Sequence, residues 1–198
     1  MGRGNRDSGA APEPPGNDDD ALVRRIAQGD ARAWRDLVGR HLNAVVAMAW
    51  RIVGERAEAE DVAQEAFVRL MAKAPAWQPG GAPVRAWLAR VAVNLAIDRK
   101  RAQRTVALDE ATETDEPDPG GVIGRRLDLE RAVRGAMNGL PKRQAAAVAL
   151  VHFEGFTNQE AADMLEISVD ALESLLARAR RRLRDRLAAV APALLAGE

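Results

Sequence analysis

Apolar residues recur at intervals of three and four between positions 21 and 104, which is the spacing of one face of an α-helix. The pattern is interrupted at three places, namely Gln28-Gly29-Asp30, Gly54-Glu55 and the stretch from Ala74 to Pro83. Glycine and proline at such interruptions are typical of helix ends and loops. The first half of the chain therefore predicts about four helices.

A helix predicted over residues 57–73 has two chemically different sides. Its apolar side is a continuous stripe formed by Ala59, Val62, Ala63, Ala66, Phe67 and Leu70. Its other side carries Asp61 and Glu65, which repel one another across one helical turn, and Arg69, which partly offsets that repulsion. An acidic helix face in a basic domain indicates a surface that binds a cationic protein, although the charges fit a solvated face equally well.

The helix predicted over residues 83–104 has an apolar row and a polar row. The apolar row consists of Val84, Leu88, Val91 and Leu95, with Trp87 as a further core residue. The polar row, which is able to contact phosphates and bases, consists of Arg90, Asn94, Arg101 and Arg104. Asn94 and Asp98 have an alternative role as residues that fix the helix by local hydrogen bonds.

The most informative local pattern lies between residues 157 and 187, where two capped helices follow one another. Thr157 and Glu160 form a capping box at the start of a short helix. Ser168 is a second N-cap, and Asp170 follows in the first turn, where the helix dipole favours an acid. The arrangement predicts a helix-turn-helix, although two short capped helices also occur in other all-helical proteins.

The second of these helices separates packing positions from exposed ones. The inward positions are Leu172, Leu175, Leu176, Ala179, Leu183 and Leu187. The start of the outward face is where such a helix meets base edges, and the run from Arg178 to Arg186, with six arginines and one aspartate, suits phosphate contacts. A solvated helix face is the alternative reading of that run.

The predicted fold is all-α, with two small helical domains at residues 21–104 and 127–190. Residues 105–126 combine acids, prolines and glycines, which is typical of a flexible linker. Residues 1–20 are predicted to be a disordered tail, and 191–198 a short tail. We expect the two domains to fold separately and to be coupled only through the linker.

The distribution of charge along the chain indicates what kind of partner it binds. The 198 residues carry 29 basic and 29 acidic side chains, but residues 22–104 hold 15 basic against 8 acidic, and residues 105–124 hold six acidic and none basic. A basic folded block indicates a polyanionic partner such as nucleic acid.

Composition argues against several classes of function. The chain has no cysteine, so no disulfide, thiolate metal site or cysteine nucleophile is expected. Its two histidines, His41 and His152, have no carboxylate at metal-ligand spacing, and we expect them to be ordinary surface or core residues. A signal peptide and an 18-residue apolar span are both missing from the sequence. We therefore expect a cytoplasmic protein with no membrane insertion, no metal, no cofactor and no catalytic residues.

Taken in chain order, the motifs resemble those of extracytoplasmic-function (ECF) sigma factors, the small two-domain members of the sigma-70 family. They are AEDVAQEAFVRL at 59–70, AWLARVAVNLAIDRKR at 86–101, GLPKRQAAAVAL at 139–150, and FTNQEAADMLEIS followed by LARARRRLRDRL within 156–187. The resemblance covers about residues 21–188, and the interposed acidic linker agrees with it. It implies a protein that gives bacterial core RNA polymerase its promoter choice and its ability to melt promoter DNA.

The resemblance also assigns roles to residues. In the family, the first domain binds the clamp helices of the polymerase beta-prime subunit and opens the −10 promoter element, and the second binds the beta flap and reads the −35 element. The residues that would face the clamp are Asp61, Gln64, Glu65 and Arg69. Those at the −10 element would be Trp77, Arg90, Asn94, Asp98 and Arg101, and those at the −35 element Ser168, Asp170, Ala171, Glu173, Ser174, Arg178, Arg180 and Arg181.

Two further expectations follow from the resemblance. The loop from Trp77 to Pro83 would help to hold an unstacked base of the opened strand. An anti-sigma protein that covers polymerase-binding surfaces is an expected partner, because members of the family are often held inactive in this way.

One stretch departs from the family pattern. Members commonly have a Thr-Val-Lys-Ser-Arg-like run at the start of the recognition helix, where this chain has Ala171-Leu172-Glu173-Ser174-Leu175. A cation is thus replaced by Glu173, which can accept a hydrogen bond from a cytosine amino group. We expect −35 recognition that is weaker or of unusual sequence.

Two other functions compete with a sigma factor. A helix-turn-helix regulator that binds duplex DNA without polymerase predicts tight operator binding by the chain alone. An enzyme that uses the carboxylates around Asp61 and Glu65 is disfavoured, because the sequence offers no histidine partner and no pocket motif for it.

Overall fold

The computed structural model describes residues 18–106 and 132–195, with the side chains of 100–106 and 189–195 left undescribed. The elements in order are α1 (Asp18–Ala27), α2 (Ala31–Val53), α3 (Arg56–Lys73), the 3-10 turn η1 (Ala74–Ala76), α4 (Val84–Val106), α6 (Lys142–Val148), the π-helical turn η2 (Ala149–Phe153), α7 (Asn158–Leu165) and α8 (Val169–Leu195). No strand occurs in these two ranges, so the all-α prediction is confirmed.

The helix ends of the first half follow from local side-chain chemistry. Asp30 caps α2, because its Oδ1 accepts from the amides of Arg32 at 2.8 Å and Ala33 at 3.2 Å. Gly54 ends the same helix at a φ of 89°, a left-handed conformation that glycine adopts without steric cost. The breaks expected at residues 28–30 and 54–55 are both confirmed, as are four helices before residue 107.

The first unit is built around α2, which packs against α1, α3 and α4. The whole stripe predicted on α3 is buried. On α4, Val84 and Leu88 are fully buried, whereas Trp87, Val91 and Leu95 are partly buried against the core. The centre of that face is made by small residues that the apolar row omitted, namely Ala89, Ala92, Val93 and Ala96. Small side chains allow close approach of the helices.

The second unit contains the predicted helix-turn-helix. Thr157 and Glu160 form the capping box, with the Thr157 amide 2.8 Å from Glu160 Oε2 and the Glu160 amide 3.2 Å from Thr157 Oγ1. Ser168 Oγ accepts from the Ala171 amide at 3.2 Å, as expected of the second N-cap. Between the two helices Glu166 has a φ of 54°, which is unfavourable for a residue with a side chain.

Three predicted boundaries were misplaced. The expected tail ended at residue 20, but Asp18, Asp19 and Asp20 form the first turn of α1, where acids suit the helix dipole. The linker was expected from residue 105, whereas α4 continues to Val106. The C-terminal tail was expected from 191, whereas α8 continues to Leu195. The rest of the predicted tails and linker, residues 1–17, 107–131 and 196–198, lie outside the described residues.

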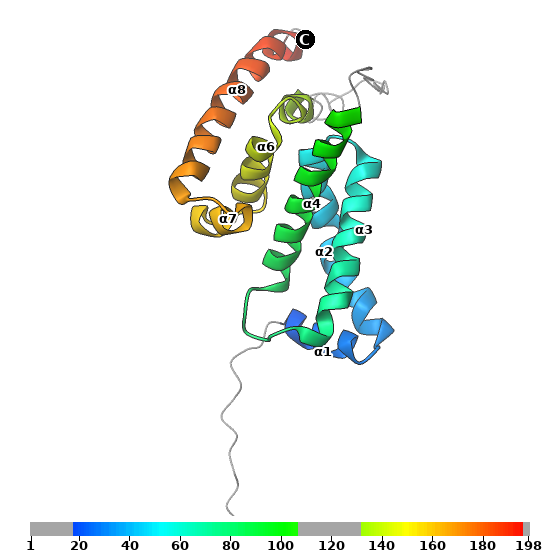
Figure 1. The fold of residues 1–198 in the computed structure, drawn as a ribbon. Coiled ribbons are helices and arrows are strands. Elements are labelled where there is room, and N and C mark those ends of the chain that lie inside the picture. Colours follow the sequence, from blue (N-terminus) through cyan, green and yellow to red (C-terminus); the bar gives the residue numbers. More distant parts are fainter. Residues whose placement is uncertain (1–17, 107–131, 196–198) are drawn as a thin grey trace, which may run out of the picture.

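The two units contact each other directly, so the linker is not the only coupling between them. Their buried side chains form one hydrophobic cluster, and α6 and α7 lie beside α2 and α4 (Figure 1). Three arginines lie over aromatic rings across this interface: Arg51 over Phe153 at 4.2 Å, Arg85 over Phe156 at 4.5 Å and Arg134 over Trp50 at 4.1 Å. Such cation–π contacts were not predicted, because nothing local in the sequence pairs these residues.

Candidate functional site

The polymerase-facing residues expected on α3 form one exposed surface. The side chains of Asp61, Glu65 and Arg69 are 64%, 41% and 53% exposed. Asp61 Oδ2 lies 3.1 Å from Arg99 Nη1 of α4, and Glu65 Oε1 lies 2.9 Å from Arg69 Nε. The Glu65–Arg69 contact was predicted, whereas the Arg99 contact was not. Both pairs are open to solvent, which weakens them and leaves these groups available to a partner.

Next to this surface lies an apolar groove between α2 and α3, with a volume of about 540 Å³. Gln64 of the expected polymerase set lines it, together with Trp34, Val38, Leu42, Val46, Trp50, Phe67 and Val68. Leu42 and Val68 are 37% and 53% exposed, so the groove presents large apolar side chains to solvent. Sequence reasoning missed the groove, although apolar residues at every fourth position of α2 from Trp34 to Trp50 were a signal for it.

The residues expected at the −10 element lie along α4 and the loop before it. Arg90 and Asp98 are exposed, and Asn94 is half-buried. The side chains three and four positions after Asp98 lie outside the described residues, so the alternative of local helix fixing by Asn94 and Asp98 stays a prediction. The side chain of Arg101 lies outside the described residues.

Trp77, at the start of that loop, is held on two sides. Its ring meets Trp87 edge-on, with ring centroids 6.1 Å apart, so both tryptophans pack together. Its indole Nε1 donates to Asp20 Oδ1 at 2.8 Å. Trp77 is thus a fixed, half-buried residue at the edge of the loop.

The residues expected at the −35 element share one exposed surface of the second unit. Each of them is exposed: Ser168, Asp170, Ala171, Glu173, Ser174, Arg178, Arg180 and Arg181. The opposite side of the helix packs inward through Leu172, Leu176 and Ala179, as predicted. Glu173 Oε1 also accepts a long hydrogen bond, 3.4 Å, from Asn158 Nδ2 of α7. This exposed cationic helix has the geometry needed to lie in a DNA groove.

Neither histidine belongs to a cluster of potential metal ligands. In residues 18–106 and 132–195, no group of three or more His, Asp or Glu side chains could hold a metal ion. His41 Nε2 lies 2.8 Å from Asp19 Oδ2, and His152 is exposed. Over the same two ranges, no helix is long and apolar enough to cross a membrane.

Two family models match the chain, one in each of the two helical units. Residues 37–106 match the family model of Sigma-70 region 2, and residues 130–183 match that of Sigma-70, region 4. The chain is 31% identical to the ECF RNA polymerase sigma factor SigE of Mycolicibacterium smegmatis, over 82% of this chain and 65% of that protein. It is 31% identical to the RNA polymerase sigma factor CnrH of Cupriavidus metallidurans, over 85% of this chain and 94% of that protein.

Two solved structures of sigma factors are also similar to this chain. A structure of CnrH in complex with the cytosolic domain of CnrY is similar with a TM-score of 0.64 and 29% identity, covering 87% of this chain and 99% of that one. The sigma factor RpoE in complex with the anti-sigma factor NepR from Bartonella quintana has the same fold, with a TM-score of 0.62, 24% identity, and coverage of 79% and 98%.

Proposed function

Because the chain belongs to the ECF RNA polymerase sigma factors, we propose that it binds core RNA polymerase through α3, opens the −10 element through α4 and reads the −35 element through α8. A sigma factor is a transcription initiation factor and not an enzyme, so the proposed activity needs no catalytic centre and no cofactor. We also propose the cytoplasm, where polymerase and promoter DNA are found, as its place of action.

One observation supports the polymerase assignment most directly. The charged surface of α3 lies next to the apolar groove between α2 and α3, and Gln64 belongs to both. A helical partner such as the beta-prime clamp could insert apolar side chains between α2 and α3 and place its cations near Asp61 and Glu65. Apolar burial would supply most of the affinity, and the charges would supply orientation and association rate. The second unit would bind the beta flap in the same holoenzyme.

Strand opening needs no covalent chemistry in this proposal. Unstacking a base costs a few kcal/mol, and capture of the unstacked base by protein offsets part of that cost. Exposed Arg90 of α4 would hold the phosphates beside the captured strand. The exposed arginines of α8 would contribute phosphate contacts at the −35 element, and Glu173 and its neighbours would contact base edges.

An anti-sigma protein is the third proposed partner. The similar solved structures include a CnrH complex with the cytosolic domain of CnrY and an RpoE complex with the anti-sigma factor NepR. A regulator that covered the groove between α2 and α3 would compete directly with polymerase for this chain.

Charge reversal on α3 tests the proposal. Asp61→Lys with Glu65→Lys should weaken the complex with core polymerase by more than about tenfold, because two cations would then face the cationic partner. The matched control is Asp36→Lys with Asp185→Lys, which makes the same change in net charge at exposed positions outside α3. Gel filtration and fluorescence anisotropy with core polymerase measure binding, and circular dichroism verifies that helicity is retained.

Undiminished binding by the α3 double variant would remove the clamp assignment and favour the free helix-turn-helix regulator. The regulator predicts that the chain alone protects a duplex operator from nuclease digestion. The sigma factor proposal predicts protection of promoter DNA only after core polymerase is added.

A further inference from the structure

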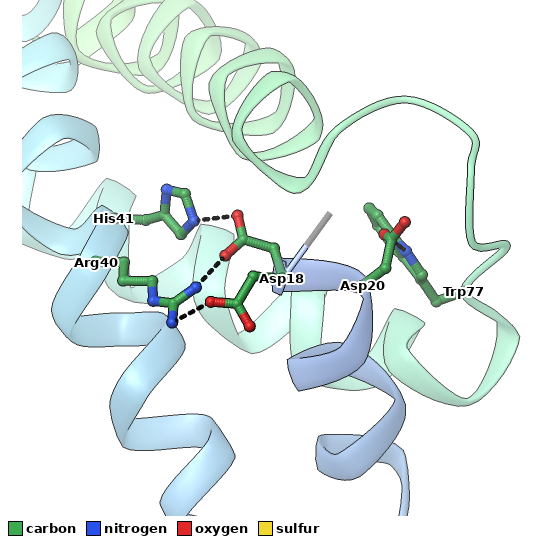
Figure 2. Close-up of polar contacts among 6 residues, drawn as sticks. Asp18, Asp20, Arg40, His41 and Trp77 are labelled. Carbon is green, nitrogen blue, oxygen red and sulfur yellow. Dashed lines mark hydrogen bonds and ion pairs between the residues drawn. The ribbon is translucent and has the colours of Figure 1, made fainter. Parts of the chain in front are cut away.

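Asp20 uses both carboxylate oxygens to hold the loop that precedes α4. Its Oδ1 accepts from Trp77 Nε1 at 2.8 Å, and its Oδ2 accepts from the Gly80 amide at 3.1 Å. The residue is only 7% exposed, although it lies in the first turn of α1. Figure 2 shows Asp20 on α1 facing Trp77 on the loop.

The loop has little internal structure of its own. Gln78, Pro79 and Ala82 are exposed, and the only backbone hydrogen bond described inside the loop joins the Gly81 amide to the Gln78 carbonyl at 3.3 Å. Gly80 has a φ of 77°, so its amide can turn toward α1 where most residues would be strained. The shape of the loop therefore depends on contacts from outside it, and Asp20 supplies two of them.

The neighbouring acid, Asp19, contacts α2 and makes no contact with the loop. Asp19, which is 8% exposed, accepts from Arg40 Nη1 at 3.1 Å and lies 2.8 Å from His41 Nε2, so α1 is joined to α2. Asp18 lies 2.6 Å from Arg40 at the surface. One turn of α1 is thus anchored to the helical core by Asp19 and to the loop by Asp20.

We propose that Asp20 is a positioning residue that fixes the loop from Trp77 to Pro83 in the shape that receives an unstacked base of the −10 element. The inference rests on the proposed function, in which this loop holds the base, and it adds the residue that preorganises the loop. A loop that is already ordered loses less conformational entropy when a base binds, so capture is more favourable. An ionised carboxylate is well suited to this, because hydrogen bonds to a charged acceptor are stronger than neutral ones.

Asp20→Asn is the informative variant, because an amide keeps the size of the side chain but offers one acceptor oxygen in place of two. One of the two loop donors then faces an NH₂ group. Asp19→Asn is the matched control, since it lies in the same helical turn, is equally buried, and contacts α2 but not the loop. Asp20→Glu restores the carboxylate and should recover most of the lost function.

The experiment measures binding of holoenzyme, assembled from the full chain and core polymerase, to single-stranded −10 oligonucleotides. One set is intact and the other carries a single abasic site at each position in turn. In the native chain and in Asp19→Asn, removal of the captured base should weaken binding by about tenfold or more. We call this loss of affinity the abasic penalty. In Asp20→Asn the abasic penalty should be about five- to tenfold smaller, because a disordered loop gains less binding energy from the base.

A purely structural role for Asp20 predicts a different result. Asp20→Asn would then weaken binding to intact and abasic oligonucleotides by the same factor, or lower core binding and thermal stability without changing the abasic penalty, and either outcome overturns the inference. Equal behaviour of Asp20→Asn and Asp20→Glu would also overturn it. Should Asp20→Asn fail to assemble with core polymerase, Trp77→Phe removes the indole donor, together with part of the ring that packs against Trp87, and must reproduce the reduced penalty.

A different set of results would overturn the proposed function itself. A native chain that does not bind core polymerase, or that opens no promoter with it, would overturn the sigma factor assignment. A native holoenzyme that opens promoters but shows no abasic penalty at any position would overturn the base-holding role of the loop, and with it the role of Asp20.

Discussion

Arg90 of α4 donates a hydrogen bond to Glu166 in the turn of the helix-turn-helix, with 2.8 Å between Nη2 and Oε1. The two residues are 76 positions apart in the chain and belong to different units. The contact places a carboxylate on the cation proposed to bind −10 phosphates, so Glu166 and DNA would compete for the same guanidinium. The side chains are 51% and 68% exposed, which limits the strength of the pair.

Glu166→Gln should therefore raise the affinity of the free chain for a single-stranded −10 oligonucleotide, because Arg90 would no longer have an acidic partner. An exposed pair contributes at most about 1 kcal/mol, which limits the gain to about fivefold. Arg90→Gln is the control background, in which the same change at Glu166 should have no effect. A fall in affinity on Glu166→Gln would show that Glu166 supports DNA binding.

Glu166 also carries an unfavourable backbone conformation, which gives a separate prediction for stability. Glu166→Gly should stabilise the chain by about 1 kcal/mol in the Arg90→Gln background, since glycine adopts a positive φ without steric cost. In the native background the gain should be smaller, because the ion pair is lost at the same time. Urea unfolding of the four variants measures both effects, and destabilisation in both backgrounds would contradict the assignment of strain.

Much of the fold could be predicted because its determinants are local. The capping box of Thr157 and Glu160 involves residues three apart, and the buried stripe of α3 follows from helical spacing alone. A side-chain oxygen close to a free backbone amide specifies a helix cap, and apolar residues on one helix face specify a buried stripe. Both signals lie within one or two helical turns. The exposed side of α8 was predicted for the same reason.

Features that depend on distant partners could not be predicted. Three consecutive aspartates at 18–20 have the composition of a solvated tail, and only the positions of His41 and Trp77 in the folded chain explain the burial of Asp19 and Asp20. The contact between Arg90 and Glu166 likewise leaves no sequence pattern. A single sequence specifies which residues can pack or pair, but the pairing of residues far apart is decided by the packing of whole helices.

Glu154 gives the interface between the two units a pH dependence. Burial raises the pKa of Glu154 above its ordinary value of 4.5, and the nearby charges of Arg51 and Arg85 only partly oppose this. Burial also lowers the pKa of Arg51. The folded state thus binds the Glu154 proton more tightly than the unfolded state, so this contribution to stability is complete at low pH and is lost as the pH rises through the raised pKa.

Glu154→Gln should consequently be more stable than the native chain at neutral pH, and the difference should shrink as the pH falls toward 4.5, the ordinary pKa of a glutamate. The variant keeps the backbone carbonyl of residue 154, to which Arg85 donates. Urea unfolding over a series of pH values measures the effect, with Glu55→Gln, at an exposed position that makes no capping bond, as the control. A difference that grew as the pH fell would reverse the sign assigned to Glu154.

Positions along α8 should differ in phenotype, because Glu173 lies on the part of the helix that we propose reads base edges, whereas Arg180 and Arg181 lie farther along the exposed face. Glu173→Ala should change the preferred base at one position of the −35 element, where the free-energy difference between bases should shift by about 1 to 3 kcal/mol. The salt dependence of binding should change little. Arg180→Ala should weaken all promoters alike and reduce the salt slope by about one.

A promoter library transcribed with each variant at two salt concentrations separates these outcomes. Glu173 also accepts a hydrogen bond from Asn158, so Asn158→Ala is the control that removes this contact while keeping the carboxylate. Loss of −35 preference in Glu173→Ala but not in Asn158→Ala would assign base reading to the carboxylate itself. Unchanged −35 sequences with Glu173→Ala would instead make Glu173 a solvated acid near the start of α8, favoured there by the helix dipole.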